Sequence, residues 1–322
     1  IFYLALKFAN HKKKNFNNNK LNRIIICSVM WGAYKELFIK FGLTSLLSNK
    51  NIPLLIERGF KIKFIIATIP NPTFENQVLN KLQSTLSKDN FEIEFHYYEK
   101  MESDKIKQYL IKIYEQSVKE DTIIWPANPD HSYSDGSISN VISMMDSDDC
   151  CIAAPIFRVD EDSFLKNFKK QEISFSLNSL IPFSLENLHS SNLLALRKNI
   201  GWITGIVFEK INNNYLVTHV VQNIFAARMN QSDIKFFKKH SYDVFDHRWP
   251  SKIFLQKRLK LVSTSDLFFS VELTNKDYGK LNKTNDYWNF SNLPLRYNNK
   301  RYLHSNIMGI CPYFLRVQYE KN

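Results

Sequence analysis

The chain has 322 residues, of which 44% are hydrophobic and 14% aromatic, and this composition predicts a folded globular protein rather than a disordered one. The formal net charge of +12 favours anionic partners such as phosphorylated small molecules, anionic lipid surfaces or nucleic acid. Glycine is scarce, and neither G-x-G-x-x-G nor G-x-x-x-x-G-K-[ST] occurs, so the usual grounds for predicting an NAD enzyme, a P-loop NTPase or a protein kinase are missing.

The four cysteines form no C-x-x-C pair and include the adjacent Cys150 and Cys151, a pattern that fits neither a zinc site nor a disulfide scaffold. Cys27 and Cys151 lie in apolar runs, where a free cysteine behaves as a small hydrophobic residue. A reducing compartment is therefore expected, which predicts a cytoplasmic protein. Peripheral association with the inner face of a membrane is a further expectation, since the chain is basic.

In chain order, residues 1–23 form an N-terminal segment that ends in a basic, Asn-rich linker, and residues 24–156 alternate between strand and helix patterns. This alternation predicts an α/β fold, with a mostly parallel central sheet that has helices on both faces. The expected strands are Ile24–Met30, Lys61–Ile69, Phe91–Tyr98, Thr122–Trp125 and Cys150–Ile156, and the expected helices are Trp31–Leu47, Thr73–Leu86, Asp104–Lys119 and Ser137–Met145.

Residues 157–322 have a different pattern, which predicts an α+β part packed onto the first half. Phe164–Arg197 is expected to be helical and loop-like. Val207–Val220 is expected to form short strands around a turn at Asn212–Asn214, and Phe268–Leu273 another strand. Ile224–Leu261 has a mixed pattern.

The segment Thr122–Ser139 carries the strongest functional signal, because Asp130, His131 and Asp135 follow a buried strand directly. In open α/β sheets, ligands bind where the strands end, and two acids there can hold a divalent cation (Mn or Mg) that binds a diphosphate. We expect Asp130 and Asp135 to lie close together and to face one pocket. The alternatives are an Asn-Pro-Asp turn at Asp130 and an N-cap at Asp135, whose helix N-terminus is itself an anion site.

Two further groups of polar residues have competing interpretations. The D-x-D sequence around Asp146, Asp148 and Asp149 follows a helix and precedes a strand, so it is expected to be a solvated turn away from the crevice. Asp246 and His247 can supply a base that reaches the same pocket as Asp130, or they can belong to a surface turn in which Trp249 is a packing anchor.

The segments WGAYKELFIKFGLTSLLSNKNIPLL, KIKFIIATIP, PDHSYSDGS, VFDHRWPSKIF and VSTSDLFFSVEL resemble a group of bacterial glycosyltransferase-like proteins with the nucleotide-diphospho-sugar transferase (GT-A) fold. The resemblance covers most of residues 24–275 and is one of pattern.

The resemblance implies that Met30, Trp31, Gly32 and Thr68 lie near the nucleotide. It also implies that Asp130 takes the role of the metal-binding D-x-D, with His131 or Asp135 as a substitute for its missing partner. Residues 24–156 would then bind the nucleotide-sugar, and 157–322 would face the acceptor.

The function expected from these observations is glycosyl transfer. A nucleotide-diphospho-sugar is the expected donor and a polysaccharide, lipid-linked or protein-linked acceptor the second substrate; Asp246 and His247 are candidates for the catalytic base. The alternative is a non-catalytic nucleotide- or nucleic-acid-binding protein, although no nucleic-acid-binding motif supports a nucleic acid partner.

Overall fold

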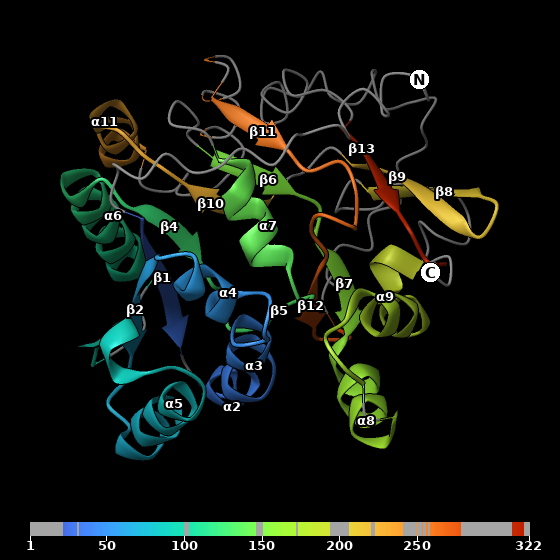
Figure 1. Cartoon of the computed structure of the whole chain (residues 1–322), viewed down its shortest axis with the longest axis horizontal. Coiled ribbons are helices and arrows are strands. Elements are labelled where there is room, and N and C mark those ends of the chain that lie inside the picture. Colours follow the sequence, from blue (N-terminus) through green and yellow to red (C-terminus); the bar gives the residue numbers. More distant parts are fainter. Residues whose placement is uncertain are drawn as a thin grey trace. The chain divides into compact units, whose positions relative to one another are not determined.

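The computed structural model (Figure 1) describes residues 22–30, 32–99, 103–145, 151–171, 173–193, 206–219, 223–240, 249, 253, 256, 258–277 and 311–318. The chain divides into two compact units. We call the described residues of Lys13–Ala153 and Ile224–Lys260 the large-sheet unit, and those of 154–223 and 261–322 the small-sheet unit. The functional division at residue 156 stays a prediction. By contacts, the large-sheet unit also includes a segment from the second half of the sequence.

The large-sheet unit is built on seven strands in the order β11-β6-β10-β4-β1-β2-β3. The four strands from β3 to β4 are parallel, whereas β10 is antiparallel to β4, so the expected mostly parallel α/β sheet is confirmed. The strand bounds are β1 Arg23–Met30, β2 Lys61–Thr68, β3 Phe91–Tyr97, β4 Ile123–Pro126, β6 Cys151–Ala154, β10 Asn223–Ala227 and β11 Leu259–Leu261.

The strand order creates a topological switch point between β1 and β4. From β1 the chain moves outward through β2 and β3, and it then returns to the opposite side of β1 as β4. The connections that follow β1 and β4 therefore diverge at the carboxyl ends of these strands, and such a point is where open α/β sheets bind ligands.

The central strands are buried on both faces, which explains their nearly continuous apolar sequences. On one face, Ile25 and Cys27 pack in a cluster with side chains of α6 (Ser103–Glu120) and α11 (Gln231–Lys239), where the rings of Tyr114 and Phe237 lie 5.6 Å apart. The neighbouring residues Ile24 and Ile26 alternate to the other face and are also buried.

Several helices follow the parallel strands, as expected. α5 (Pro72–Thr85) begins where Asn71 accepts a hydrogen bond from the main-chain N of Phe74, and the short 3₁₀ turn η2 (Lys88–Asn90) precedes β3. α4 (Ile52–Glu57), which the sequence pattern did not indicate, packs against α7 (Ser137–Met144) and β2.

The segment after β1 differs from the single helix expected over Trp31–Leu47. It consists of α2 (Tyr34–Leu37), the π-helix η1 (Phe38–Gly42) and α3 (Leu43–Leu46). Each hydrogen bond of a π-helix spans one residue more than in an α-helix, and over five residues this difference does not change the apolar pattern enough to be recognised from sequence.

The expected loop after β4 also needs correction, because it contains the short strand β5 (His131–Tyr133), whose three side chains are buried. Three residues are too few to show a strand periodicity.

The small-sheet unit contains a parallel pair, β7 (Phe157–Asp160) and β12 (Ser270–Thr274), and an antiparallel sheet in the order β13-β9-β8. The antiparallel strands are β8 Ile206–Ile211, β9 Asn214–His219 and β13 Cys311–Leu315. The turn expected between β8 and β9 is present, with Asn212 in the left-handed region at φ 56°. The helices of this unit are α8 Glu161–Gln171 and α9 Leu177–Glu186.

Two further properties of the described residues concern the cysteines and the helices. Cys27 and Cys151 are buried free cysteines, and burial raises the pKa of the Cys27 thiol to about 12. In the part of the chain that the structure describes, no helix combines the length and the apolar character needed to cross a bilayer.

Candidate functional site

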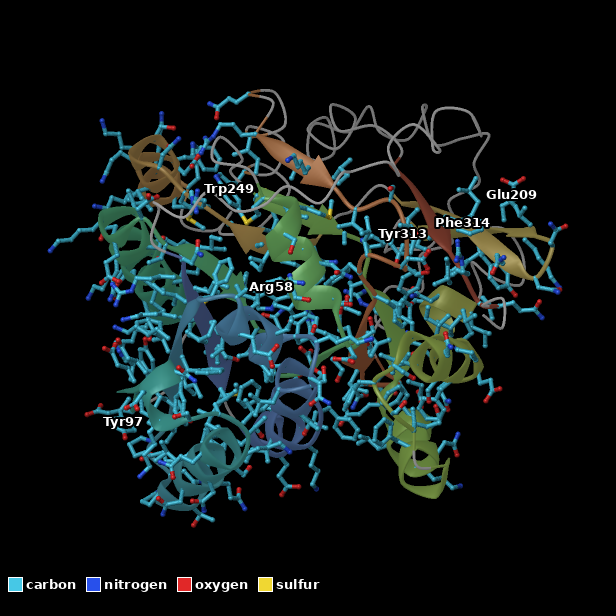
Figure 2. The ribbon with its side chains drawn as sticks, viewed as in Figure 1. Arg58, Tyr97, Glu209, Trp249, Tyr313 and Phe314 are labelled. Carbon is cyan, nitrogen blue, oxygen red and sulfur yellow. The ribbon has the colours of Figure 1, made fainter. Side chains whose placement is uncertain are left out.

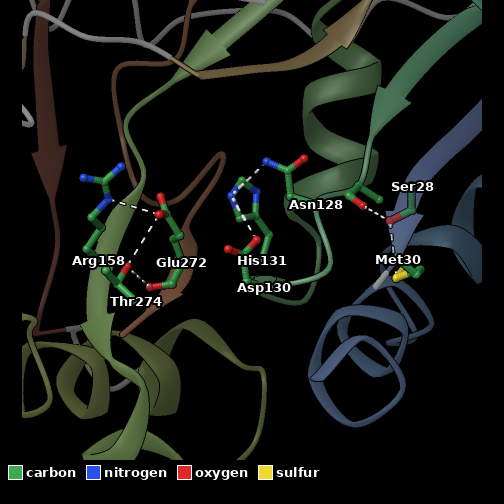
Figure 3. Close-up of polar contacts among 9 residues, drawn as sticks. Ser28, Met30, Asn128, Asp130, His131, Arg158, Glu272 and Thr274 are labelled. Carbon is green, nitrogen blue, oxygen red and sulfur yellow. Dashed lines mark hydrogen bonds and ion pairs between the residues drawn. The ribbon is translucent and has the colours of Figure 1, made fainter. Parts of the chain in front are cut away.

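Two hydrogen bonds join the ends of β1 and β4 at the switch point. The main-chain N of Ala127 donates to the carbonyl oxygen of Cys27 at 2.8 Å, and the Ser28 hydroxyl donates to the carbonyl oxygen of Ala127 (Figure 3). These bonds fix the point at which the chain leaves β4. The residues that follow are therefore held at the carboxyl end of the sheet.

Asn128, Pro129, Asp130 and His131 form a turn at this point, closed by a hydrogen bond of 3.1 Å from the main-chain N of His131 to the carbonyl oxygen of Asn128. This is the Asn-Pro-Asp turn named as an alternative interpretation, and proline is favoured at its second position. The turn is more than a local connection, because its polar side chains converge on one atom. Nε2 of His131 lies 3.3 Å from Asn128 Nδ2 and 3.9 Å from Asp130 Oδ1 (Figure 3).

His131 is the buried member of this group. Its side chain is only 6% exposed, whereas that of Asp130 is 21% exposed and Asn128 is an exposed residue. The imidazole lies beside Tyr133 and Phe225, with ring centroids 6.4 and 6.3 Å away. His131 is thus embedded in aromatic side chains, and the amide and carboxylate above it face outward.

The aromatic layer beneath the turn is apolar enough to change ionisation. Trp125 and Phe225 pack around Tyr133, and burial raises the pKa of the Tyr133 hydroxyl, opposed in part by a hydrogen bond with Trp125. The negative charge of Asp130 adds to this rise in the pKa. Tyr133 is therefore a neutral residue that supports the turn, not a base.

The next part of the segment, Ser134–Ile138, is locked by Asn51, which is completely buried. The Asn51 side-chain oxygen accepts hydrogen bonds from the main-chain N of Gly136 at 3.0 Å and of Ile138 at 2.9 Å. Its Nδ2 lies 2.8 Å from the carbonyl oxygen of Ser45 and 3.1 Å from that of Ser134. Asn51 therefore caps the N-terminus of α7 from a distant part of the chain.

Two expectations about this helix end are wrong. The N-cap residue is Gly136, at φ 93°, and not Asp135. Two of the N–H groups that would form an anion site are already bonded to Asn51, so this end of α7 is occupied by the protein itself.

Asp135 has a partner of its own. Its Oδ1 accepts a hydrogen bond of 2.7 Å from the main-chain N of Lys50. Asp130 and Asp135 lie at opposite ends of β5, and in the described residues no group of three His, Cys, Asp or Glu side chains converges as a metal site. The structure therefore does not combine Asp130, His131 and Asp135 into one ligand set.

Gly42, the last residue of η1, supports the turn from behind. A Cβ atom built on Gly42 would lie 3.3 Å from the carbonyl oxygen of His131 and 3.5 Å from that of Pro129, and it would also lie 3.0 Å from Phe38. The π-helix therefore approaches the Asn128–His131 turn more closely than a side chain would allow. Single π-turns occur frequently at functional sites.

A divalent cation fits this turn only in part. The Asp130 carboxylate is half-buried and open on one side, as a cation ligand needs to be, and Asn128 offers an amide oxygen when its side chain rotates. His131 fits less well as a ligand, because it is buried and its Nε2 is already within hydrogen-bond distance of Asn128. A cation at this turn would take Asp130 and Asn128 from the protein and its remaining ligands from substrate phosphates and water.

Met30, Gly32 and Thr68, which are expected near a nucleotide, lie at the same edge of the sheet. Met30 and Thr68 end β1 and β2 and are paired in register, and both side chains are fully buried. Gly32 is exposed at φ 48°, and a Cβ atom built on it would have no other atom within 4 Å. This edge therefore offers a ligand main-chain groups and open space rather than side chains from Met30 and Thr68.

Other candidates lie outside the described residues: Trp31, Asp146, Asp148, Asp149, Asp246 and His247. Their roles stay predictions. Trp249, labelled in Figure 2, is described and is the packing anchor that was expected. It is fully buried, with its indole N donating to Asp233 Oδ1 at 3.3 Å.

Sequence reasoning missed two residues of this region. Asn128 stands two positions before Asp130, so the two residues form an N-x-D motif with the spacing of D-x-D. This spacing could have indicated Asn128 from the sequence. Asn51 gave no signal, because its partners lie more than 80 positions away in the chain.

No protein-family model matches the chain, and no curated protein matches it. Its structure is similar to that of a mannosyltransferase, PcManGT from Pyrobaculum calidifontis, determined in complex with GDP-Man and Mn2+. The TM-score is 0.42 at 9% sequence identity, over 95% of this chain and 75% of the other. A structural similarity of this degree does not indicate an activity, so any function has to be inferred from the residues of the site.

Proposed function

We propose that the protein is a glycosyltransferase that moves a sugar from a nucleotide-diphospho-sugar to a glycan, lipid-linked or protein-linked acceptor. The observation that carries the proposal is the turn at the switch point. There Asn128 and Asp130, in N-x-D spacing, are held outward by the buried His131. Ligands of open α/β sheets bind at such a point.

The chemistry of the turn suits a diphosphate better than a neutral ligand. An oxygen-rich pair such as Asp130 and Asn128 prefers Mg²⁺ or Mn²⁺, which commonly takes one or two protein ligands together with phosphate oxygens. A cation bound there would neutralise the charge that develops on a leaving diphosphate. Asp130 and Asn128 would bind and orient the cation and the diphosphate. The buried His131 would position Asn128, whose Nδ2 lies 3.3 Å from the His131 Nε2.

In the proposed reaction, an acceptor hydroxyl oxygen forms a bond to the anomeric carbon of the donor sugar. The bond from that carbon to the phosphate oxygen breaks, and the nucleoside diphosphate leaves with the electron pair. The hydroxyl proton passes to a base. Asp246 and His247 remain the sequence-based candidates for that base.

The test is a thermal-shift titration with UDP, GDP, CDP, ADP and dTDP, each with Mn²⁺, with Mg²⁺ and with EDTA. A ligand at 100 times its dissociation constant should stabilise the protein by about 2.7 kcal/mol. One nucleotide should stand out in the presence of the cation, and Asp130→Asn should remove the cation-dependent part of its effect. Asp135→Asn is the matched control, because it removes a charge from the same segment and keeps an acceptor for Lys50.

Release of nucleoside diphosphate from the matching nucleotide-sugar then tests catalysis. Binding of a nucleotide without any turnover would favour the non-catalytic binding protein. If none of the five nucleotides shifts the melting temperature with either cation, the proposal is wrong.

A further inference from the structure

The small-sheet unit contains a polar strand face of its own. In the parallel pair of β7 and β12, Arg158 is in register with Glu272, and Asp160 with Thr274. The alternate residues of the same strands are buried and apolar, and Phe157 packs on the ring of Tyr313 at 5.9 Å. One face of this pair is thus core, and the other gathers charged and hydroxyl groups.

Glu272 is the centre of the polar face, and its two carboxylate oxygens differ. Oε1 lies 3.1 Å from Arg158 Nε and 3.5 Å from the Thr274 hydroxyl (Figure 3). Within the described ranges, Oε2 has no hydrogen-bond partner, although the Glu272 side chain is only 17% exposed. A carboxylate oxygen in a half-buried position requires a donor, from water or from a ligand.

A buried histidine supports the main chain of Arg158. His189 is fully buried, its main-chain N donates to the carbonyl oxygen of Arg158 at 3.0 Å, and its Nδ1 lies 2.9 Å from the Ser191 hydroxyl. Burial lowers the pKa of His189, opposed by the charge of Asp160, so the ring does not compete with Arg158 for Glu272 at neutral pH. Arg158 is therefore the cation that neutralises Glu272.

The arrangement fits a hydroxyl group better than a metal ion. No three metal-ligating side chains converge there in the described part of the chain, and the guanidinium of Arg158 beside Glu272 repels a cation. A sugar hydroxyl matches both groups, because its hydrogen can be donated to the carboxylate while its oxygen accepts from a guanidinium. Hydrogen bonds to a charged group are stronger than neutral ones.

We infer that Glu272, oriented by Arg158 and Thr274, binds a hydroxyl group of a sugar acceptor through Oε2. The inference rests on the proposed glycosyltransferase function, since it assigns the acceptor-binding element of that activity to this face of β7 and β12. Glu272 contacts the acceptor, and Arg158 is a positioning residue.

The experiment separates acceptor binding from the donor half of the reaction. The probes are methyl glycosides of glucose, galactose, mannose and N-acetylglucosamine. Each glycoside is supplied as the acceptor. The donor is the nucleotide-sugar that contains the nucleotide found to stabilise the protein in the thermal-shift titration. Hydrolysis of that donor by water is measured in parallel. Glu272→Gln keeps an oxygen for Arg158 and Thr274 but replaces the accepting oxygen with an amide that donates. Asp162→Asn is the control, because it neutralises an exposed acid of the same unit that pairs with Lys276 at 3.4 Å.

We expect Glu272→Gln to lower kcat/KM for the best methyl glycoside about 10- to 100-fold, mainly through KM, and to leave hydrolysis of the donor unchanged. Asp162→Asn should change neither. Equal acceptor KM values in wild type and Glu272→Gln would overturn the inference and leave the glycosyltransferase proposal intact. The same conclusion would follow if the wild type hydrolysed the donor but transferred sugar to none of the methyl glycosides. Absence of both hydrolysis and transfer in the wild type would overturn the two together.

Discussion

Asp130 and Asp135 lie five residues apart in one segment, both directly after a buried strand, and the structure gives them different surroundings. The front of the segment, around Asp130, is an exposed turn whose polar groups are gathered by a buried imidazole. The rear, around Asp135, is bound to the main-chain N of Lys50 and to the side chain of Asn51, both in the connection between α3 and α4. At the front the Asp130 side chain is 21% exposed and Asn128 is exposed, whereas the rear uses its polar groups to keep the segment in place.

The difference shows that position after a strand is not enough to identify an acidic residue as a cation ligand. The hydrogen bonds that the residue already makes within the protein must be known as well. The Asp135 oxygen is bonded at 2.7 Å to Lys50 N, and the N–H groups of Gly136 and Ile138 are bonded to Asn51. The rigidity of the rear is then a condition for function at the front. Both ends flank one short strand, so a shift of the rear would move Asp130 as well.

The largest effect is expected from Asn51→Ala, which removes the cap of α7 and the links to Ser45 and Ser134. Several buried polar groups lose their partner, so unfolding free energy should fall by about 3–5 kcal/mol. Urea denaturation measures this. The control is Asn71→Ala, which removes a single cap bond at α5 and should cost about 1 kcal/mol. Equal losses in the two variants would contradict the role given to Asn51.

Asp130→Asn should affect turnover rather than stability. Loss of a charge that stabilises the leaving diphosphate should lower kcat/KM by about 100-fold, which corresponds to about 2.7 kcal/mol. The melting temperature should hardly change, since the side chain is partly exposed. Steady-state kinetics and a thermal melt on the same sample give both values. Turnover equal to that of wild type would remove Asp130 from the site.

Gly42→Ala tests the support behind the turn. In most helices this substitution is stabilising, but here the new methyl group would meet Phe38 at 3.0 Å and the His131 carbonyl oxygen at 3.3 Å. Overpacking of this kind costs about 1–3 kcal/mol. Turnover should fall too, because the carbonyl that moves belongs to the Asn128–His131 turn. A rise in melting temperature would show that η1 and the Asn128–His131 turn are not in close steric contact at Gly42.

Asp135→Ala should have the smallest effect. It removes one partly exposed hydrogen bond to Lys50 N and should lower the unfolding free energy by about 1 kcal/mol with no loss of nucleotide binding. Asp135→Asn should restore the stability, because an amide oxygen accepts the same bond. A loss of nucleotide affinity in Asp135→Asn would place Asp135 in the site after all.

The sequence predicted what depends on local patterns. Strand-length apolar runs with β-branched residues indicated β1, β2 and β4, because buried parallel strands need to be apolar on both faces, and an alternating pattern indicated β3. The alternation of these strands with helices indicated a parallel sheet. The same reasoning located the segment after β4 as the place of a ligand site. It gave Asp130 the role of the D-x-D and named an N-cap as the alternative for Asp135, but it kept both as candidates for one pocket. The partners that hold Asp135 cannot be recognised from the chain.

The sequence by itself determined the order of the strands β1 to β4, the helices α5 and α6 between them and the residue types at the end of β4, because periodicity and residue type are properties of the chain. Only the tertiary structure decided how exposed each of these groups is and which of them hold the segment in place. The bonds from Asn51 to Gly136 and Ile138, the close approach of Gly42 to the turn and the pairing of Arg158 with Glu272 all join residues distant in sequence. Such contacts leave no local pattern, because each partner is compatible with many other neighbours until the chain folds.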